Sequence, residues 1–216
     1  MAGTEDKYNY GTGMNPTCQK LILATERLLR RDGLSHVTTR KIAQEAGVSE
    51  GALYHHFRDK AELLHAVVLI SMGDFREILD GLPLLVGQRT VGENLEHMLQ
   101  AAFEFQFKIV PIACSLYADH LLLARTREIL SERGIGPQCS ITVIAAYLQA
   151  EQRLGRVAAD LKPEAASQLL LAGSFHKAMF DHFLARDLSE DVTRRHLREM
   201  VNALLAGIEP RPAGKN

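Results

Sequence analysis

The sequence lacks an uninterrupted apolar run of the roughly 18 residues that a membrane-spanning helix needs. Its N-terminus, MAGTEDKYNYGTGMNPT, mixes acidic and basic residues and has no apolar core of the kind found in signal peptides. The three cysteines (Cys18, Cys114 and Cys139) form no CxxC pair, which argues against a zinc knuckle or a disulfide framework. We therefore expect a cytoplasmic protein with reduced thiols and no membrane partner.

Motifs of catalysis are also missing. The chain contains no HExxH, no GxSxG, no P-loop and no Glu-x-x-His pair repeated on two helices. We therefore assign no catalytic residue, cofactor or metal ligand, and we expect that the protein is not an enzyme. Nine histidines keep metal sensing open as an alternative, because residues distant in sequence can converge in space.

The residues that are present favour an all-α protein. Hydrophobic residues make up 46% of the 216 positions and charged residues 24%, which is typical of a globular chain. Apolar residues recur at helical spacing and seldom alternate with polar ones, so we expect about nine helices. Residues 1–60 carry nine Lys and Arg against seven Asp and Glu, and the remainder carries sixteen against nineteen. This weak asymmetry hints at a polyanionic partner for the N-terminal part.

Capping signals divide the chain. We expect a flexible tail over residues 1–14, a helix-turn-helix domain over 15–60, a helical effector-binding and dimerisation domain over 61–210, and a disordered tail over 211–216. After the helix-turn-helix the pattern predicts one helix from about Asp59 to Pro83. A further helix should end before Pro111, and another should cover 112–134.

A helix-turn-helix is predicted between Thr38 and Phe57. Thr38 is suited to cap one helix and Gly47 to end it, while Ser49 can cap the next helix, EGALYHHF. In such motifs the second helix lies in the major groove of DNA and its first residues face base edges. Small or polar residues fill this tip, followed by side chains that can donate hydrogen bonds: Glu50, Gly51, Ala52, then Tyr54 and His55.

The string TTRKIAQEAGVSEGALYHHFRDKAELL, preceded by LATERLLRRDG, resembles the TetR family of transcriptional regulators. The resemblance covers about residues 17–67 and departs from the commonest pattern at Thr25 and Leu29, two positions of the first helix. It implies a three-helix DNA-binding domain, joined through a fourth helix to a dimerising helical body. Beyond residue 67 the chain matches only in helix count and lengths.

By this resemblance, part of the motif contacts DNA phosphates and part lies near base edges. The residues that contact phosphates are Thr39, Tyr54, His55 and Lys60. The residues near base edges are Arg40, Glu50, Gly51 and Ala52. Ser49, which caps the second helix, completes the DNA-binding set. Arg40 is suited to fork onto guanine O6 and N7. Glu50 is suited either to accept a hydrogen bond from cytosine N4 or to cap its own helix, and the sequence does not decide between the two.

The penultimate predicted helix is apolar on more than one side and the last helix carries a sustained apolar stripe, which together predict a homodimer. The candidate interface is Leu169, Gly173, Phe180, Leu184, Leu197, Met200, Val201 and Leu204. A two-fold dimer implies a roughly palindromic double-stranded DNA operator.

Polar and aromatic residues that interrupt apolar faces are candidates for an effector site. They are His97, Phe103, Gln106, Phe107, Cys114, Tyr117, His120, Tyr147, His176 and Met179. Together they predict a mainly neutral, aromatic cavity for a small hydrophobic effector. The resemblance implies a repressor that the effector releases from DNA by tilting the fourth helix. A DNA-binding protein that needs no effector is the remaining alternative.

Overall fold

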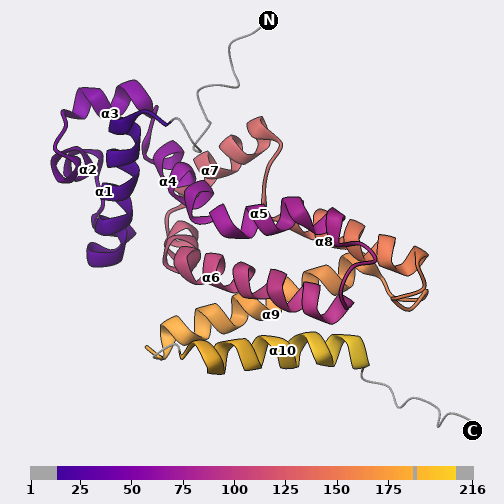
Figure 1. Ribbon diagram of the computed structural model, residues 1–216. Helices are drawn as coiled ribbons and strands as arrows, with labels where there is room; N and C mark the ends of the chain where they lie inside the picture. Colours follow the sequence, from indigo (N-terminus) through magenta and orange to yellow (C-terminus); the bar gives the residue numbers. More distant parts are fainter. Residues whose placement is uncertain (1–13, 187–188, 208–216) are drawn as a thin grey trace, which may run out of the picture. The chain divides into compact units, whose positions relative to one another are not determined.

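The computed structural model describes residues 14–186 and 189–207. The tails expected over residues 1–14 and 211–216 lie outside these ranges, except for Met14. Within the described residues the chain is all-helical, with ten α-helices and two short 3₁₀-helices and without strands (Figure 1). The all-α prediction is confirmed, and the expected number of nine helices is one too low.

The N-terminal half contains α1 (Pro16–Asp32), η2 (Leu34–His36), α2 (Thr39–Ala46), α3 (Glu50–His56), α4 (Lys60–Ser71), α5 (Gly73–Gly81) and η3 (Leu82–Leu85). The remaining helices are α6 (Val91–Ala118), α7 (His120–Arg133), α8 (Pro137–Arg153), α9 (Pro163–Phe183) and α10 (Glu190–Ala206). None of the described helices is by itself both long and apolar enough to cross a bilayer. Only α6 and α7 taken together meet that criterion, and they form a pair bent by 117°.

The chain forms two compact units. The first comprises the described residues of 1–73 together with 108–136, and the second comprises 74–107 together with the described residues of 137–216. The chain thus passes between the units at three places, and one of them lies inside α6.

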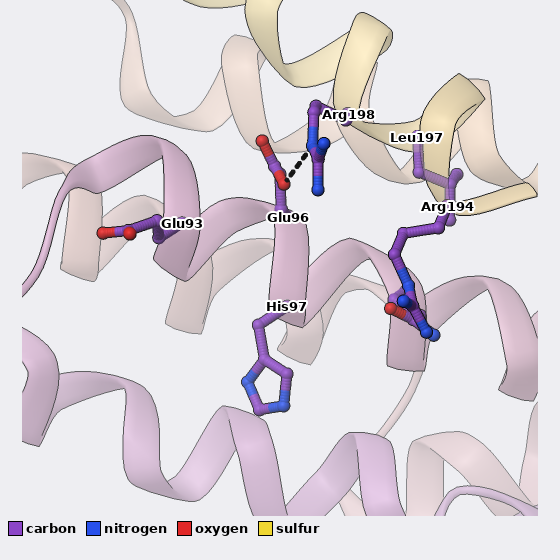
Figure 2. A pocket seen from close by; sticks show the side chains of 7 residues that line it. Glu93, Glu96, His97, Arg194, Leu197 and Arg198 are labelled. Carbon is purple, nitrogen blue, oxygen red and sulfur yellow. Dashed lines mark hydrogen bonds and ion pairs between the residues drawn. The ribbon is translucent and has the colours of Figure 1, made fainter. Parts of the chain in front are cut away.

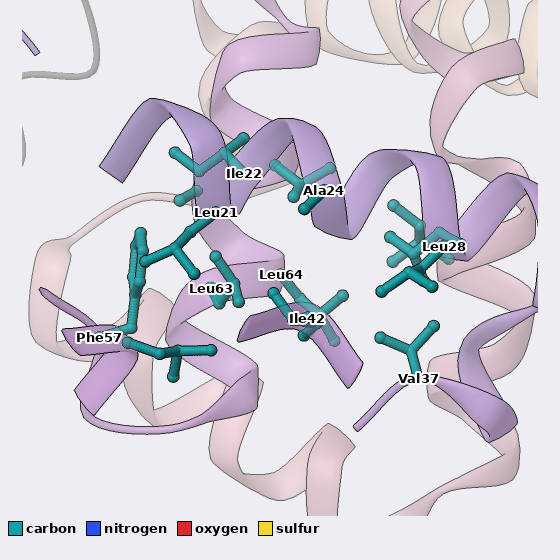
Figure 3. Packing of buried hydrophobic residues seen from close by; sticks show 14 of the residues in the cluster. Leu21, Ile22, Ala24, Leu28, Val37, Ile42, Phe57, Leu63 and Leu64 are labelled. Atoms are coloured by element: carbon teal, nitrogen blue, oxygen red, sulfur yellow. The ribbon is translucent and has the colours of Figure 1, made fainter. Parts of the chain in front are cut away.

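The core of the first unit is built by α1, α2, α3 and α4 around a single apolar cluster (Figure 3). In this cluster Leu21 of α1 lies toward the end where Phe57 is found, and Leu28 lies toward the other end, near Val37. Ile112, from the last turns of α6, is also part of it. Apolar residues that recur at helical spacing on these helices therefore fill this core.

The second unit is a layered arrangement of long helices in which α9 contacts both α8 and α10. The first half of α6 contributes Leu95, Met98 and Leu99 to its buried side chains, and α8 contributes Ile144 and Leu148. Gly173 of α9 faces α10 so closely that a Cβ at this position would lie 2.2 Å from Met200 Cε. The tip of the Met200 side chain therefore fills the space above Gly173, and any side chain at this position would require Met200 to shift.

Three predicted helix boundaries are wrong. The helix expected from Asp59 to Pro83 breaks at Met72, so that α4 and α5 are separate; Gly73, which follows, is a poor residue for a helix interior. Helix α6 continues through Pro111 to Ala118. The break that the sequence places at Pro111 occurs instead at Asp119, whose side chain caps α7 by accepting a hydrogen bond from Leu122 N at 3.0 Å.

Pro111 has no N–H to offer the carbonyl of Phe107, four residues earlier in α6. In the structure His182 of α9 takes over this role, because its Nε2 lies 2.7 Å from the Phe107 oxygen and donates to it. The two rings also stack, with centroids 3.9 Å apart. A side chain from a distant helix therefore satisfies the group that the proline leaves open, and α6 continues.

Candidate nucleic-acid interface

The turn between α2 and α3 is built by local backbone chemistry. Thr38 caps α2 by accepting a hydrogen bond from Lys41 N at 3.3 Å. Gly47 ends α2 in the left-handed conformation with φ of 68°, which a glycine adopts without steric cost. Ser49 then caps α3 by accepting from Ala52 N at 3.1 Å. The predicted helix-turn-helix is thus present, with three residues between its helices.

Helix α3 is divided into an inner and an outer face. Leu53 is fully buried and Phe57, directly after the helix, is buried as well. Glu50, Tyr54 and His55 are exposed on the opposite side. The apolar side chains therefore hold the helix against the core, while the outer face presents carboxylate, hydroxyl and imidazole groups to the surroundings.

A hydrogen-bonded cluster joins the outer faces of α2 and α3. Thr39 Oγ1 donates to Glu50 Oε1 at 2.7 Å, and the Tyr54 hydroxyl lies 3.3 Å from the same Thr39 oxygen. We call these three residues the Thr39–Glu50–Tyr54 cluster. Of the other residues predicted near base edges, Arg40 and Gly51 are exposed and Ala52 is half-buried.

Lys60, the remaining predicted phosphate contact, is half-buried at the start of α4. Its Nζ donates to the carbonyl oxygen of Leu34 at 3.0 Å, and so it ties α4 to the short η2 helix. Burial lowers the pKa of this ammonium below its usual value. An ammonium has three N–H donors, so this bond leaves further donors for a phosphate.

Sequence reasoning missed two ion pairs that fix α7 against the start of α4. Arg125 Nε lies 2.8 Å from Asp59 Oδ2, and Arg133 Nη2 lies 3.0 Å from Glu62 Oε1. Burial alone would raise the pKa of Asp59, but hydrogen bonds from Arg125 and from backbone N–H groups outweigh it and hold that pKa below its usual value. Partners 66 and 71 residues apart leave no local signal in the sequence.

His65 lies one turn beyond Glu62 in the same buried region. Its pKa falls to about 4, first because burial disfavours the charged ring and second because the Arg133 guanidinium repels it. The ring is therefore neutral near pH 7. No hydrogen-bond partner for its Nε2 is found within the described part of the chain.

Comparison with known proteins shows which of them carry a similar motif. Residues 21–67 match the family model described as bacterial regulatory proteins, tetR family. The helix-turn-helix segment thus matches the TetR family. The HTH-type transcriptional regulator UidR of Escherichia coli K12 is 22% identical over 212 residues, which cover 91% of this chain and 97% of UidR. The HTH-type transcriptional repressor BepR of Brucella suis is 26% identical over 167 residues, which cover 72% of this chain and 76% of BepR.

A solved structure shows the same fold. FadR from Bacillus subtilis, determined in complex with stearoyl-CoA, superposes with a TM-score of 0.64 at 16% sequence identity, and covers 88% of this chain and 99% of FadR. At that identity the likeness concerns the fold. The match of residues 21–67 to the tetR-family model, together with the likeness to named regulators over most of the chain, indicates a transcriptional regulator with a helix-turn-helix DNA-binding domain.

The predicted effector residues do not all lie in one unit. Seven are in the second unit: His97, Phe103, Gln106, Phe107, Tyr147, His176 and Met179. Cys114, Tyr117 and His120 belong to the first unit, and all three are exposed, Tyr117 by 72%. The set therefore does not surround a single cavity within either unit.

The buried members of the set have their polar groups satisfied within the protomer. Gln106 Nε2 donates to Leu171 O at 3.1 Å, and its Oε1 accepts from the Ser174 hydroxyl. The Tyr147 hydroxyl accepts from Asn94 Nδ2 at 2.9 Å, and burial raises its pKa to about 12. These contacts explain why polar residues interrupt apolar helix faces here.

A shallow pocket in the second unit lies between the N-terminal part of α6 and α10 (Figure 2). It is lined by Glu93, Glu96, His97, Gln100, Arg194, Leu197 and Arg198. An ion pair of 2.9 Å between Glu96 and Arg198 crosses it. The pocket is charged rather than aromatic, and His97 alone of the predicted effector residues lines it. Among the residues that the structure describes, no three of His, Cys, Asp or Glu are grouped closely enough to hold a metal ion.

The predicted dimer residues separate into buried and exposed ones. Leu197 and Val201 are buried in the protomer, and Gly173 and Met200 face each other between α9 and α10. Leu204 is half-buried. Leu169, Phe180 and Leu184 of the α9 region are exposed, and so is Phe183, a residue that the sequence interpretation omitted. We call these four residues the exposed α9 surface.

Proposed function

We propose that the protein is a ligand-responsive repressor that binds a palindromic operator as a homodimer. In this proposal a small, mainly hydrophobic effector releases it from DNA. The observation that carries the DNA-binding part is the outer face of α3, where every exposed side chain is polar while the inner face is locked into the core by Leu53 and Phe57. A rigid short helix with a polar outer face is the element that such regulators insert into the major groove.

On this proposal α3 lies in the major groove and its rims contact the DNA backbone. Thr39, Tyr54, His55 and Lys60 bind phosphates. Arg40 and the start of α3, from Ser49 to Ala52, face base edges. A Cβ at Gly51 would meet only Ser49 Oγ, at 3.8 Å, so the free protein has room for a side chain there. The glycine therefore favours close approach of a base edge to the backbone.

Homodimerisation is supported by the exposed α9 surface. Leu169, Phe180 and Phe183 are spaced by 11 and 3 residues, which places them on one side of a helix. Phe183 is 82% exposed and Leu169 is 65% exposed. Large apolar side chains gathered on one side of a helix indicate a protein interface. A second copy of the chain supplies a matching surface, and two-fold symmetry of the dimer then requires a palindromic operator.

Release by an effector is supported by the second unit and by the named relatives. The unit contains stacked aromatic residues, among them Phe75 with Phe105, whose ring centroids lie 5.8 Å apart, and an apolar ligand suits such surroundings. BepR is named a repressor, and the FadR structure contains stearoyl-CoA. Because α4 ends at Ser71, the segment that would tilt on effector binding is α4 without α5. Helix α7 would move with α4, because two ion pairs join them.

Binding to labelled DNA tests the proposal. We expect Tyr54→Ala and Lys60→Ala to weaken binding to every duplex and to reduce its salt dependence, as loss of a phosphate contact requires. Tyr117→Ala and Lys162→Ala replace exposed residues outside the motif and should leave affinity unchanged. Fluorescence anisotropy with duplexes from the DNA flanking the gene, and with random duplex as competitor, measures both. Unchanged affinity of the first two variants would contradict the docking.

Addition of a panel of fatty-acyl and aromatic compounds to the protein–operator complex tests the effector. A hydrophobic member should lower the anisotropy by releasing DNA. Release by a divalent metal ion instead would favour a metal sensor, and no release by any compound would favour a regulator without an effector.

A further inference from the structure

The Thr39–Glu50–Tyr54 cluster places an anion of the protein beside the groups that are proposed to bind DNA phosphates. Thr39 Oγ1 donates to the Glu50 carboxylate at 2.7 Å. A hydroxyl has one hydrogen to donate, so the Thr39 hydrogen is already used. The Tyr54 hydroxyl lies 3.3 Å from Thr39 Oγ1. Because the Thr39 hydrogen points at Glu50, Tyr54 is the donor in this second contact and Thr39 Oγ1 is the acceptor.

The carboxylate of Glu50 therefore resembles a phosphate oxygen of DNA in two respects. It is negatively charged, and it accepts the hydrogen bond that Thr39 would otherwise give to DNA. Glu50 is exposed, and among the described residues it forms no ion pair. Its charge thus remains available to repel a nearby phosphate.

A structural explanation of the contact is weaker. Helix α3 is capped by Ser49 rather than by Glu50. The two helices are held together beneath the surface by Ile42, Leu53 and Phe57. The surface hydrogen bond between Thr39 and Glu50 is therefore an addition to a packing that is already in place.

We propose that Glu50 determines specificity by acting as an internal substitute for phosphate, a role that rests on the proposed docking of α3. Any duplex must displace the carboxylate from Thr39 before a phosphate can take that hydroxyl. This exchange lowers affinity for DNA of every sequence. The loss is recovered only where the freed carboxylate meets an amino group in the major groove, such as cytosine N4. Glu50 therefore suppresses non-specific binding more than operator binding.

Two variants separate charge from hydrogen bonding. Glu50→Gln keeps an acceptor but removes the charge, and Glu50→Ala removes both. Glu77→Gln makes the same charge change at an exposed position of α5 and serves as the matched control. The measurement is the fluorescence anisotropy of a labelled random-sequence duplex over a range of salt concentrations, with thermal unfolding of each variant alongside.

We expect both Glu50 variants to bind random duplex more tightly than the parent, by about three- to tenfold at low salt, because a charge that repels phosphates is gone. The Glu77→Gln variant should bind like the parent. A purely structural hydrogen bond predicts the opposite, namely weaker binding together with a lower unfolding temperature. Equal or weaker binding of random duplex by Glu50→Gln would overturn the proposal.

Selection of preferred duplexes from a random pool completes the test. The ratio of affinity for selected over random duplex should fall by about tenfold or more in Glu50→Ala, since one mismatched base contact costs a comparable factor. An unchanged ratio would overturn the specificity role. If the parent protein binds random and selected duplexes but the Glu50 variants gain nothing, the role of Glu50 fails while the DNA-binding function stands. If the parent binds no duplex at any salt concentration, the docking itself fails.

Discussion

The two units of the molecule differ in what their exposed helices present. In the first unit α3 turns hydroxyl, carboxylate and imidazole groups outward, whereas in the second unit α9 turns leucine and phenylalanine outward. The same kind of element, an amphipathic helix packed on a core, thus offers two opposite chemistries. A polar outer face suits a polyanion that stays hydrated at its surface, and an apolar one suits a partner that excludes water.

The largest effect should come from a charge placed on the exposed α9 surface. Leu169→Glu buries a carboxylate in the proposed dimer interface and should weaken association by about 100-fold or more. Leu84→Glu alters a still more exposed leucine of the same unit, on η3, and should leave association unchanged. Sedimentation equilibrium measures both, and a parent protein that is monomeric at micromolar concentration would refute the dimer.

In the first unit the strongest single effect on stability should come from the buried ion pair. Arg133→Met leaves the Glu62 carboxylate, which is 4% exposed, without its guanidinium and should lower the free energy of unfolding by about 3 kcal/mol. Arg30→Met removes the surface pair with Glu26 and should cost less than about 1 kcal/mol. Urea denaturation of both variants measures these losses. Similar losses would show that the α4–α7 ion pair stabilises the fold no more than a surface pair does.

The buried histidine makes the first unit sensitive to acid. His65 has a pKa of about 4 in the folded chain, and its unfolded value is near 6.5. Between these values the unfolded chain binds the proton and the folded chain does not, so stability falls as the pH falls. Going from pH 7.5 to pH 5, the parent should lose about 2 kcal/mol more than His65→Leu does.

Urea midpoints at the two pH values provide the measurement for this acid effect. His97→Leu changes an exposed histidine of the second unit and should keep the acid sensitivity of the parent. If His65→Leu keeps it as well, another group causes the loss.

The smallest expected difference concerns helix caps. In the first unit Asn15, Thr38, Ser49 and Asp59 each accept a hydrogen bond from the first turn of a helix. Ser189 of α10 makes no such bond. Thr38→Ala should therefore cost about 1 kcal/mol of unfolding free energy and Ser189→Ala less than about half of that. Equal costs would remove this contrast between the two caps.

Prediction from the sequence succeeded where neighbouring residues determine the structure. The starts of α1, α2 and α3, the end of α2 at Gly47 and the inner residues of α3 are all set by neighbours within a few positions, and each was predictable. Placement of Thr39, Glu50 and Tyr54 on one surface also follows from helical spacing, but their hydrogen bonds to one another required the angle between α2 and α3.

The errors arise where distant residues decide. Pro111 ends a helix by local rules, yet α6 continues because His182 satisfies the Phe107 carbonyl. The ion pairs of α7 with α4 and the satisfied state of Gln106 depend on partners more than 60 residues away. Asp119 is different, because its capping pattern was local and could have been found.

Helix α6 is shared between the two units, with the division at residues 107 and 108. Close to this division α6 contains a proline, and the Phe107 carbonyl that Pro111 cannot bond is held by the His182 imidazole of α9. The stiffness of α6 at that point is thus set by a single histidine.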